Sequence, residues 1–177
     1  IIQKDSLKIG LEIIFFDVED YGAPNYNSSF SDLQAMNDTW CLGSQFWSYN
    51  LTENYQKPNF GILLDMVGAK NAVFPKEEIS RMYAGYHLNK IWKLGQYLGY
   101  GSFFKNKIAP PLTDDHTYIN ELAQIPTLDI IHYDISPFTN RFDFGKFHHT
   151  HQDNMEIIDR QTLKAVGQTV LTYLYNN

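Results

Sequence analysis

The chain has 177 residues, a hydrophobic content of 44%, an aromatic content of 15% and a formal net charge of −6. This length and hydrophobic content suffice for one domain with its own core and exclude a disordered chain. The acidic charge argues against nucleic-acid binding, and no apolar run is long enough for a transmembrane segment.

The first predicted element is a buried strand over residues 11–16, an apolar run followed closely by Glu19 and Asp20. Acidic side chains just beyond a strand lie where open α/β sheets bind their ligands. A solvated turn would account for the same residues, because charge runs usually face water. Residues 21–38 are rich in Asn and Ser and are predicted to form a long loop.

The rest of the chain alternates predicted helices and strands. They are a helix over 40–49, a buried strand within 60–68, a helix over 75–98, a strand starting at 103–104, a short helix over 117–122, a strand over 127–133 and a helix over 160–175. The apolar stripe of the 75–98 helix is predicted to comprise Ile79, Met82, Tyr83, Tyr86, Ile91, Leu94 and Leu98. That of the last helix is predicted to comprise Leu163, Val166, Val170, Leu171 and Leu174. This order predicts an α/β fold around a largely parallel sheet.

Acidic and imidazole side chains recur at strand ends or in the loops that follow them. The clusters are Glu19 with Asp20, Asp65, Asp114 with Asp115 and His116, and His148, His149 and His151 with Asp153. The carboxyl ends of parallel strands share one edge of a sheet, so these clusters are expected to converge. Hydrolytic zinc sites need imidazole and carboxylate ligands, together with a further carboxylate that moves a proton. A helix cap or a surface loop would explain each cluster taken alone.

The order and local sequence of these clusters resemble a known family. The segments are Phe15-Phe16-Asp17-Val18-Glu19-Asp20, Leu63-Leu64-Asp65-Met66-Val67-Gly68-Ala69, Asp114-Asp115-His116 and His149-Thr150-His151-Gln152-Asp153-Asn154. Together they are similar to the animal-type glutaminyl cyclases, a family within the superfamily of zinc-dependent leucyl-type aminopeptidases. The closing segment, residues 159–167, resembles the bacterial branch. The resemblance implies a three-layer, mostly parallel mixed sheet flanked by helices.

The resemblance also implies a role for individual residues. It makes Glu19 the general acid and base, and Asp20 and His149 zinc ligands. Asp65 matches an active-site carboxylate of cyclases, or a ligand of the second zinc in aminopeptidases. Asp114 matches an acid that is hydrogen-bonded near Asp65 in cyclases. Two further residues are assigned to substrate binding: Phe144, which matches an aromatic pocket wall, and His148.

Three departures from the family pattern affect these expectations. His148 stands where cyclases usually have Trp, and Asp129 stands where they have a His, so the hydrogen-bond network is expected to differ. The family's upstream His/Asp segment, which supplies another zinc-ligating Asp, would precede Ile1. The chain, residues 1–177, is therefore expected to be one domain, the C-terminal portion of a zinc-exopeptidase-like domain whose N-terminal part is missing.

The main hypothesis is a zinc-dependent glutaminyl-peptide cyclotransferase that acts on N-terminal Gln of peptides or proteins. The alternatives are a two-zinc aminopeptidase, in which Asp65 ligates metal, and a catalytically inactive peptide-binding relative. The acid at Asp114 favours the cyclase, because aminopeptidases more often have Ser or Thr there. Relatives of this kind are mostly exported, which implies a periplasmic or secreted protein.

Overall fold

The computed structural model describes residues 7–20, 22 and 39–176, so the loop predicted over residues 21–38 lies, apart from Gly22, outside the described residues. The elements in chain order are α2 (Leu42–Tyr49), β1 (Gly61–Asp65), β2 (Phe74–Glu77), α3 (Glu78–Tyr97), β3 (Phe104–Ala109), α4 (Asp115–Tyr118), the π-helical turn η1 (Ile119–Ala123), β4 (Thr127–Ile131), β5 (Asp134–Ile135), β6 (Phe142–Asp143), the 3-10 turn η2 (Met155–Ile157) and α5 (Arg160–Tyr175). No helix among these residues has the length and apolar character that a membrane span requires.

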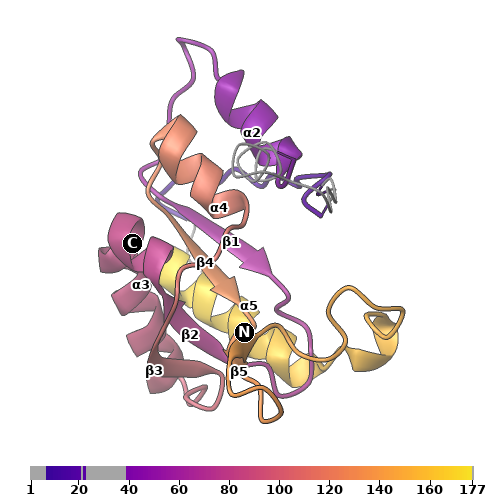
Figure 1. Cartoon of the computed structure of the whole chain (residues 1–177). Coiled ribbons are helices and arrows are strands. Elements are labelled where there is room, and N and C mark those ends of the chain that lie inside the picture. The colour runs from indigo at the N-terminus through magenta and orange to yellow at the C-terminus, as the bar shows by residue number, and fades with distance from the viewer. Residues whose placement is uncertain (1–6, 21, 23–38, 177) are drawn as a thin grey trace.

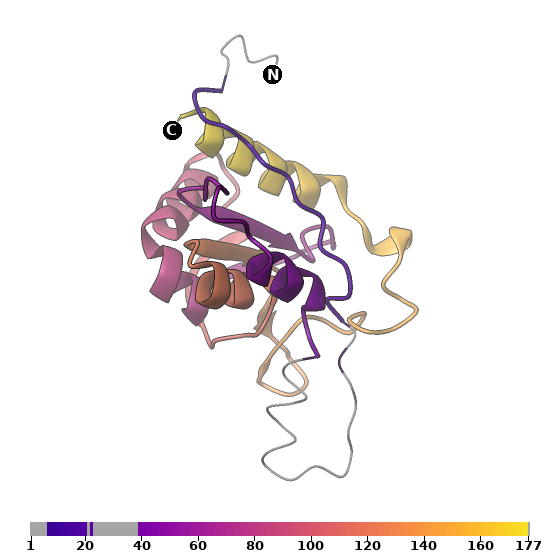
Figure 2. The same ribbon diagram turned by 90° about the horizontal axis from the view of Figure 1, so that it is seen from above.

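The strands pair mostly in parallel, as predicted. β1 and β4 are parallel, with Gly61 opposite Thr127 and Asp65 opposite Ile131. β2 and β3 are also parallel, whereas the short β5 and β6 form an antiparallel pair. Figure 2 shows α5 on one side of the strands and α2 and α4 on the other. The fold is therefore α/β with helices flanking the strands, and the carboxyl ends of β1 and β4 point the same way (Figure 1).

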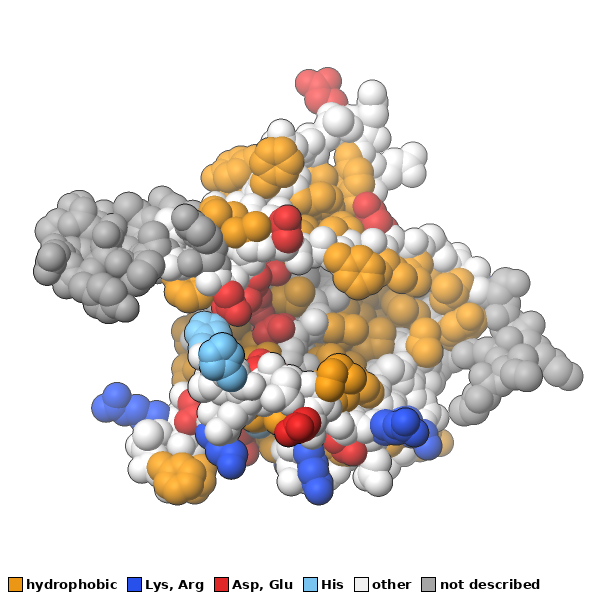
Figure 3. Space-filling model, turned by 90° about the vertical axis from the view of Figure 1, so that its right-hand side faces the viewer, with side chains coloured by type: hydrophobic (Ala, Val, Ile, Leu, Met, Phe, Trp, Pro, Cys, Tyr) orange, Lys and Arg blue, Asp and Glu red, His pale blue; other side chains and the backbone are white. Residues whose placement is uncertain are grey.

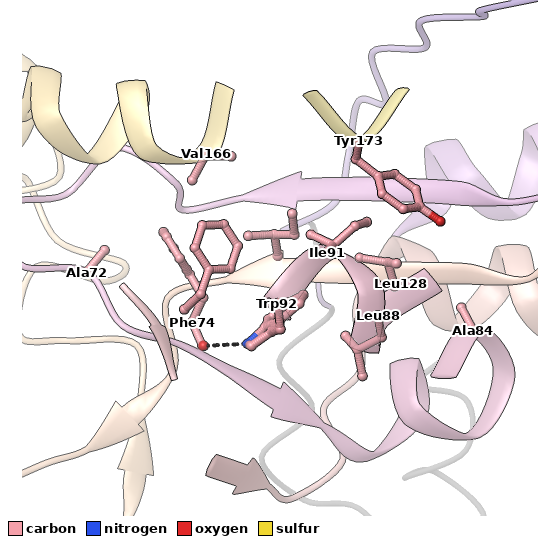
Figure 4. Packing of buried hydrophobic residues seen from close by; sticks show 11 residues of the cluster. Ala72, Phe74, Ala84, Leu88, Ile91, Trp92, Leu128, Val166 and Tyr173 are labelled. Atoms are coloured by element: carbon pink, nitrogen blue, oxygen red, sulfur yellow. Dashed lines mark hydrogen bonds between the residues drawn. The ribbon is translucent and has the colours of Figure 1, made fainter. Parts of the chain in front are cut away.

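The main hydrophobic core lies between β4, α3 and α5 (Figure 4). Successive residues of a strand point to opposite faces, so Leu128 and Ile130 enter this core while Asp129 between them faces the other side. Trp92 of α3 is fully buried, and its indole Nε1 donates a hydrogen bond of 3.0 Å to the Phe74 carbonyl oxygen. This bond joins α3 to β2 and satisfies the polar atom of the buried indole.

The strand predicted over residues 11–16 is absent from the structure. The segment has no ladder of hydrogen bonds, and Ile13 and Phe15 are 70% and 93% exposed. A strand needs a neighbouring strand to bond to, and no described strand is hydrogen-bonded to this segment. For the same reason β1, which pairs only with β4 among the described strands, is less buried than predicted, and Leu64 is 47% exposed.

The helix predicted from residue 75 begins at Glu78, because Phe74–Glu77 pairs with β3 as strand β2. The predicted stripe is wrong in the first half of α3, where Met82 and Tyr86 are each 65% exposed. The residues buried there are Ser80 and Ala84, since small side chains let the helix approach β4 closely. Ala84 also has non-helical backbone angles, so α3 is kinked at this residue.

Helix α5 matches its predicted span, but its buried face is only partly the predicted one. Val166 and Leu174 are buried, whereas Leu163 and Leu171 are 45% and 54% exposed. Other residues of the buried face are Thr162, Ala165, Thr169 and Tyr173. The hydroxyls of Thr162 and Thr169 donate to the carbonyl oxygens of Ala69 and Ala165 at 3.0 and 2.7 Å, which allows these polar side chains to be buried.

Replacing Trp92 with Ala should strongly destabilise the fold, because it removes the largest fully buried side chain and its hydrogen bond. We expect the free energy of unfolding to fall by about 3–5 kcal/mol. Tyr97→Ala is the matched control, since Tyr97 lies in the same helix but is 86% exposed; it should change the value by less than about 0.5 kcal/mol. Urea denaturation of both variants measures the difference, and equal losses would contradict the assignment of the core.

Candidate active site

Asp20 and His149, 129 positions apart in the sequence, lie side by side. The imidazole Nε2 of His149 is 2.8 Å from the Asp20 Oδ1 atom. The two side chains remain 58% (Asp20) and 47% (His149) exposed. A carboxylate oxygen and an imidazole nitrogen that face solvent together are the donor atoms that zinc binds in proteins.

Aromatic rings hold His149 in place. The ring of His148 stacks on it with centroids 3.8 Å apart, and the Trp40 ring lies nearly parallel at 6.4 Å. The backbone of His149 is left-handed, with φ of 55°. The sequence leaves open whether Trp40 lines a pocket or packs in the core, because a tryptophan is found as readily in one position as in the other.

The predicted substrate-binding residues Phe144 and His148 lie next to each other beside this pair. Their ring centroids are 4.7 Å apart, and Phe144 stacks in turn on Tyr133 at 4.9 Å. Phe144 and His148 line a hollow of about 350 Å³. Its other lining residues include Ser136, Phe138, Asp143 and Lys146. The hollow is large enough for a side chain of a bound peptide.

Glu19 is half-buried and lies close to other acids. Its Oε1 atom is 4.0 Å from the Cys41 sulfur, and ligand atoms of Glu19, Cys41 and Asp114 all lie within 4.8 Å of one another. Burial, and then the negative charges of Asp114, Asp20 and Asp65, raise the pKa of Glu19 to about 8. A carboxyl group with such a pKa is able to accept and release a proton near neutral pH.

Asp65 ends β1, and Asp114 caps α4. Burial, followed by the charge of Asp114, raises the pKa of Asp65 to about 7. Asp114 is 3% exposed and accepts a hydrogen bond of 2.6 Å from the Asp115 amide. Burial also raises the pKa of Asp114. Asp114 therefore both caps helix α4 and lies among the acids of the site.

Beneath these acids lies a fully buried layer formed by Glu77, His116 and Asp129. His116 belongs to a cluster that the sequence predicts to converge, and Asp129 to the hydrogen-bond network that is expected to differ from the family's. His116 Nε2 is 3.2 Å from a carboxylate oxygen of Glu77, and His116 Nδ1 is 3.9 Å from one of Asp129. Burial and the charge of Asp114 raise the pKa of Asp129 well above its usual range. Burial raises the pKa of Glu77 too, but hydrogen bonds from His116 and Ser80 outweigh it and leave that pKa lowered. The sequence shows no signal for Glu77, which reads as an ordinary first-turn acid.

The structure thus brings Glu19, Asp20, Asp65 and Asp114 together, with His149 joined to them through Asp20. Figure 3 shows acidic side chains in a hollow of this face, with histidine side chains directly beside them. His151 does not join the group and is exposed.

The described residues include two further groups that could hold a metal, Glu19–Cys41–Asp114 and Asp114–His116–Asp129, each with ligand atoms within 4.8 Å of one another. Both contain buried acids whose pKa values are raised, so a metal ion bound there would displace protons. The Asp20–His149 pair is exposed, so a zinc ion held by it would keep a coordination position open to substrate. A catalytic zinc has three protein ligands and an open position, and this pair supplies two of them.

Comparisons with known proteins identify the family of the chain and similar solved structures. The model of peptidase family M28 matches residues 1–174. No curated protein matches the chain. Tannerella forsythia glutaminyl cyclase is 46% identical, with a TM-score of 0.81, and the match covers 92% of this chain and 53% of that one. Porphyromonas gingivalis glutaminyl cyclase is 42% identical, with a TM-score of 0.83, and the match covers 97% of this chain and 58% of that one. A leucine aminopeptidase precursor from Bacteroides thetaiotaomicron is 44% identical, with a TM-score of 0.78, and the match covers 92% of this chain and 52% of that one. The chain spans about half the length of these structures.

The raised pKa of Asp65 makes the stability of the metal-free chain depend on pH. Because the pKa is near 3.8 when unfolded and about 7 when folded, the folded state binds more protons between these values. The contribution of Asp65 to the free energy of unfolding should therefore be largest below about pH 4 and fall as pH rises through about 7, in total by on the order of a few kcal/mol.

Asp65→Asn stays neutral at every pH, so it should reduce this fall. Urea denaturation at several pH values, with a chelator present, measures the effect. The exposed Glu53 provides a control as Glu53→Gln, which should leave the profile as in the wild type. A profile of Asp65→Asn identical to that of the wild type would contradict the burial of a protonated Asp65.

Proposed function

Because the chain belongs to peptidase family M28, we propose that the protein is a zinc-dependent glutaminyl-peptide cyclotransferase. It would convert an N-terminal Gln to pyroglutamate and release ammonia. One observation carries this proposal: the Asp20–His149 pair is adjacent to Glu19, a carboxyl group whose pKa is raised to about 8. Relatives described as glutaminyl cyclases at 42–46% identity support the same reaction.

In this proposal Asp20 and His149 hold the zinc ion. Both donor types suit zinc, and a relative described as a Zn-dependent exopeptidase supports that choice of metal. When bound, zinc would polarise the side-chain amide of the substrate glutamine. Phe144 and His148 would contact the substrate in the hollow that they line.

Glu19 would move the proton. The α-amine must lose a proton to attack the side-chain amide carbon, and the departing nitrogen must gain one to leave as ammonia. A carboxyl group of pKa about 8 is suited to both transfers at neutral pH. Asp65 and Asp114 would hold Glu19 and the substrate amine by hydrogen bonds, because buried neighbouring acids share protons rather than ionise together.

A two-zinc aminopeptidase is the second candidate, and the resemblance to a leucine aminopeptidase precursor favours it. That reaction would need Asp65 as an ionised ligand of the second zinc. In the metal-free chain, burial and the charge of Asp114 favour the protonated form of Asp65, so binding of a second zinc there would have to release that proton. An inactive relative that only binds peptides is the third candidate.

We further propose that the substrates are peptide or protein N-termini and that the protein acts outside the cytoplasm, in the periplasm or after secretion. The relative described as a precursor supports processing of this kind.

Assays of the whole protein with Gln-initiated and Leu-initiated chromogenic peptides test the proposed function. We expect turnover of the Gln-initiated peptide alone, with one zinc per molecule by elemental analysis. Turnover of the Leu-initiated peptide with two tightly bound zinc ions would establish the aminopeptidase instead. Turnover of neither would favour the peptide-binding relative.

Glu19→Gln should abolish turnover while zinc stays bound, because the variant keeps the shape of the side chain and loses only the transferable proton. A loss of at least about 10²-fold in kcat is expected for a general acid and base. His149→Ala should instead lower the zinc content. An active Glu19→Gln variant would refute the role given to Glu19.

A further inference from the structure

The segment that carries Glu19 and Asp20 is bonded to the start of helix α2. The amide of Cys41 donates to the Glu19 carbonyl oxygen at 2.8 Å, that of Leu42 to Val18 at 3.2 Å and that of Gly43 to Asp17 at 3.2 Å. The first amides of a helix have no partner within the helix, so they are free to bind another backbone. These three bonds set the position of the acidic segment.

The two backbones approach so closely that only glycine fits at position 43. A Cβ atom on Gly43 would lie 2.4 Å from the Asp17 carbonyl oxygen and 2.9 Å from the Asp17 amide nitrogen. Gly43 does not have a positive φ, so contact with Asp17, and not backbone conformation, excludes a side chain. Any larger residue must push the acidic segment away from the helix.

The bound segment is also under backbone strain. Val18 has a φ of 53°, a left-handed conformation that a β-branched residue rarely adopts. Strain of this kind persists only where surrounding contacts hold it. Because Val18 immediately precedes Glu19, its backbone angles set the directions of Glu19 toward Cys41 and of Asp20 toward His149.

We infer that Gly43 is a positioning residue for the active site: its missing side chain lets the start of α2 bond to residues 17–19 and so orients Glu19 and Asp20. The position of the segment follows from the contacts alone. Its effect on turnover rests on the proposed function.

The test is Gly43→Ala in the whole protein. Gly167→Ala is the matched control, because Gly167 also lies in a helix, α5, and nothing lies within 4 Å of an added Cβ. Hydrogen–deuterium exchange should be faster by roughly tenfold or more at the amides of residues 41–43 in Gly43→Ala and unchanged there in Gly167→Ala. In addition, kcat with a Gln-initiated peptide should fall by about 10²-fold in Gly43→Ala only.

The two readouts separate the two proposals. If the wild type turns over no peptide, the proposed function fails, and exchange at residues 41–43 still decides the role of Gly43. Exchange and kcat that match the Gly167→Ala control would overturn the inference. So would faster exchange in Gly43→Ala with an unchanged kcat in an active enzyme.

A second variant covers the case in which Gly43→Ala does not fold. Val18→Gly removes the strain at a positive φ, so the bonded segment should open less often. Exchange at residues 41–43 should then slow by roughly fivefold. Unchanged or faster exchange in Val18→Gly would overturn the inference as well.

Discussion

The burial of several carboxyl groups around Asp114 is the constraint on which the site depends. The charge of Asp114 contributes to the raised pKa of Glu19, Asp65, Asp115 and Asp129. Acids this close do not all ionise, so the fold stores protons at the place where the proposed reaction needs them. Burying these acids lowers the free energy of unfolding at neutral pH, and the hydrophobic core between β4, α3 and α5 must offset that loss.

Each part of the site comes from a different element. Glu19 and Asp20 follow an extended segment held by the start of α2, Asp65 ends β1, and Asp114 caps α4. His149 lies in a turn that is held by stacked rings. The site forms only when all of these elements are correctly placed relative to one another, so its residues come from most of the chain.

Strained backbone lies at or beside the site residues. Val18 precedes Glu19, Met66 follows Asp65, and both have a left-handed φ, as does His149 itself. Strain is retained where neighbouring contacts over-determine the backbone, and it is often found at functional sites. The positions of these three residues agree with the assignment of the site, although the assignment rests on the side-chain contacts.

The sequence by itself determined the α/β class, the helix over residues 160–175, the strand that ends at Asp65 and the identity of the acidic and imidazole clusters. These features could be predicted because periodicity and local motifs are properties of short segments. Tertiary structure alone decided which faces are buried and which clusters meet. Residues 11–16 have the composition of a strand but no described neighbouring strand, and α3 buries Ser80 and Ala84 where Met82 and Tyr86 were expected. Only packing shows that Glu77 and His116 lie beneath the acids and that Gly43 touches Asp17, because those contacts join residues far apart in the chain.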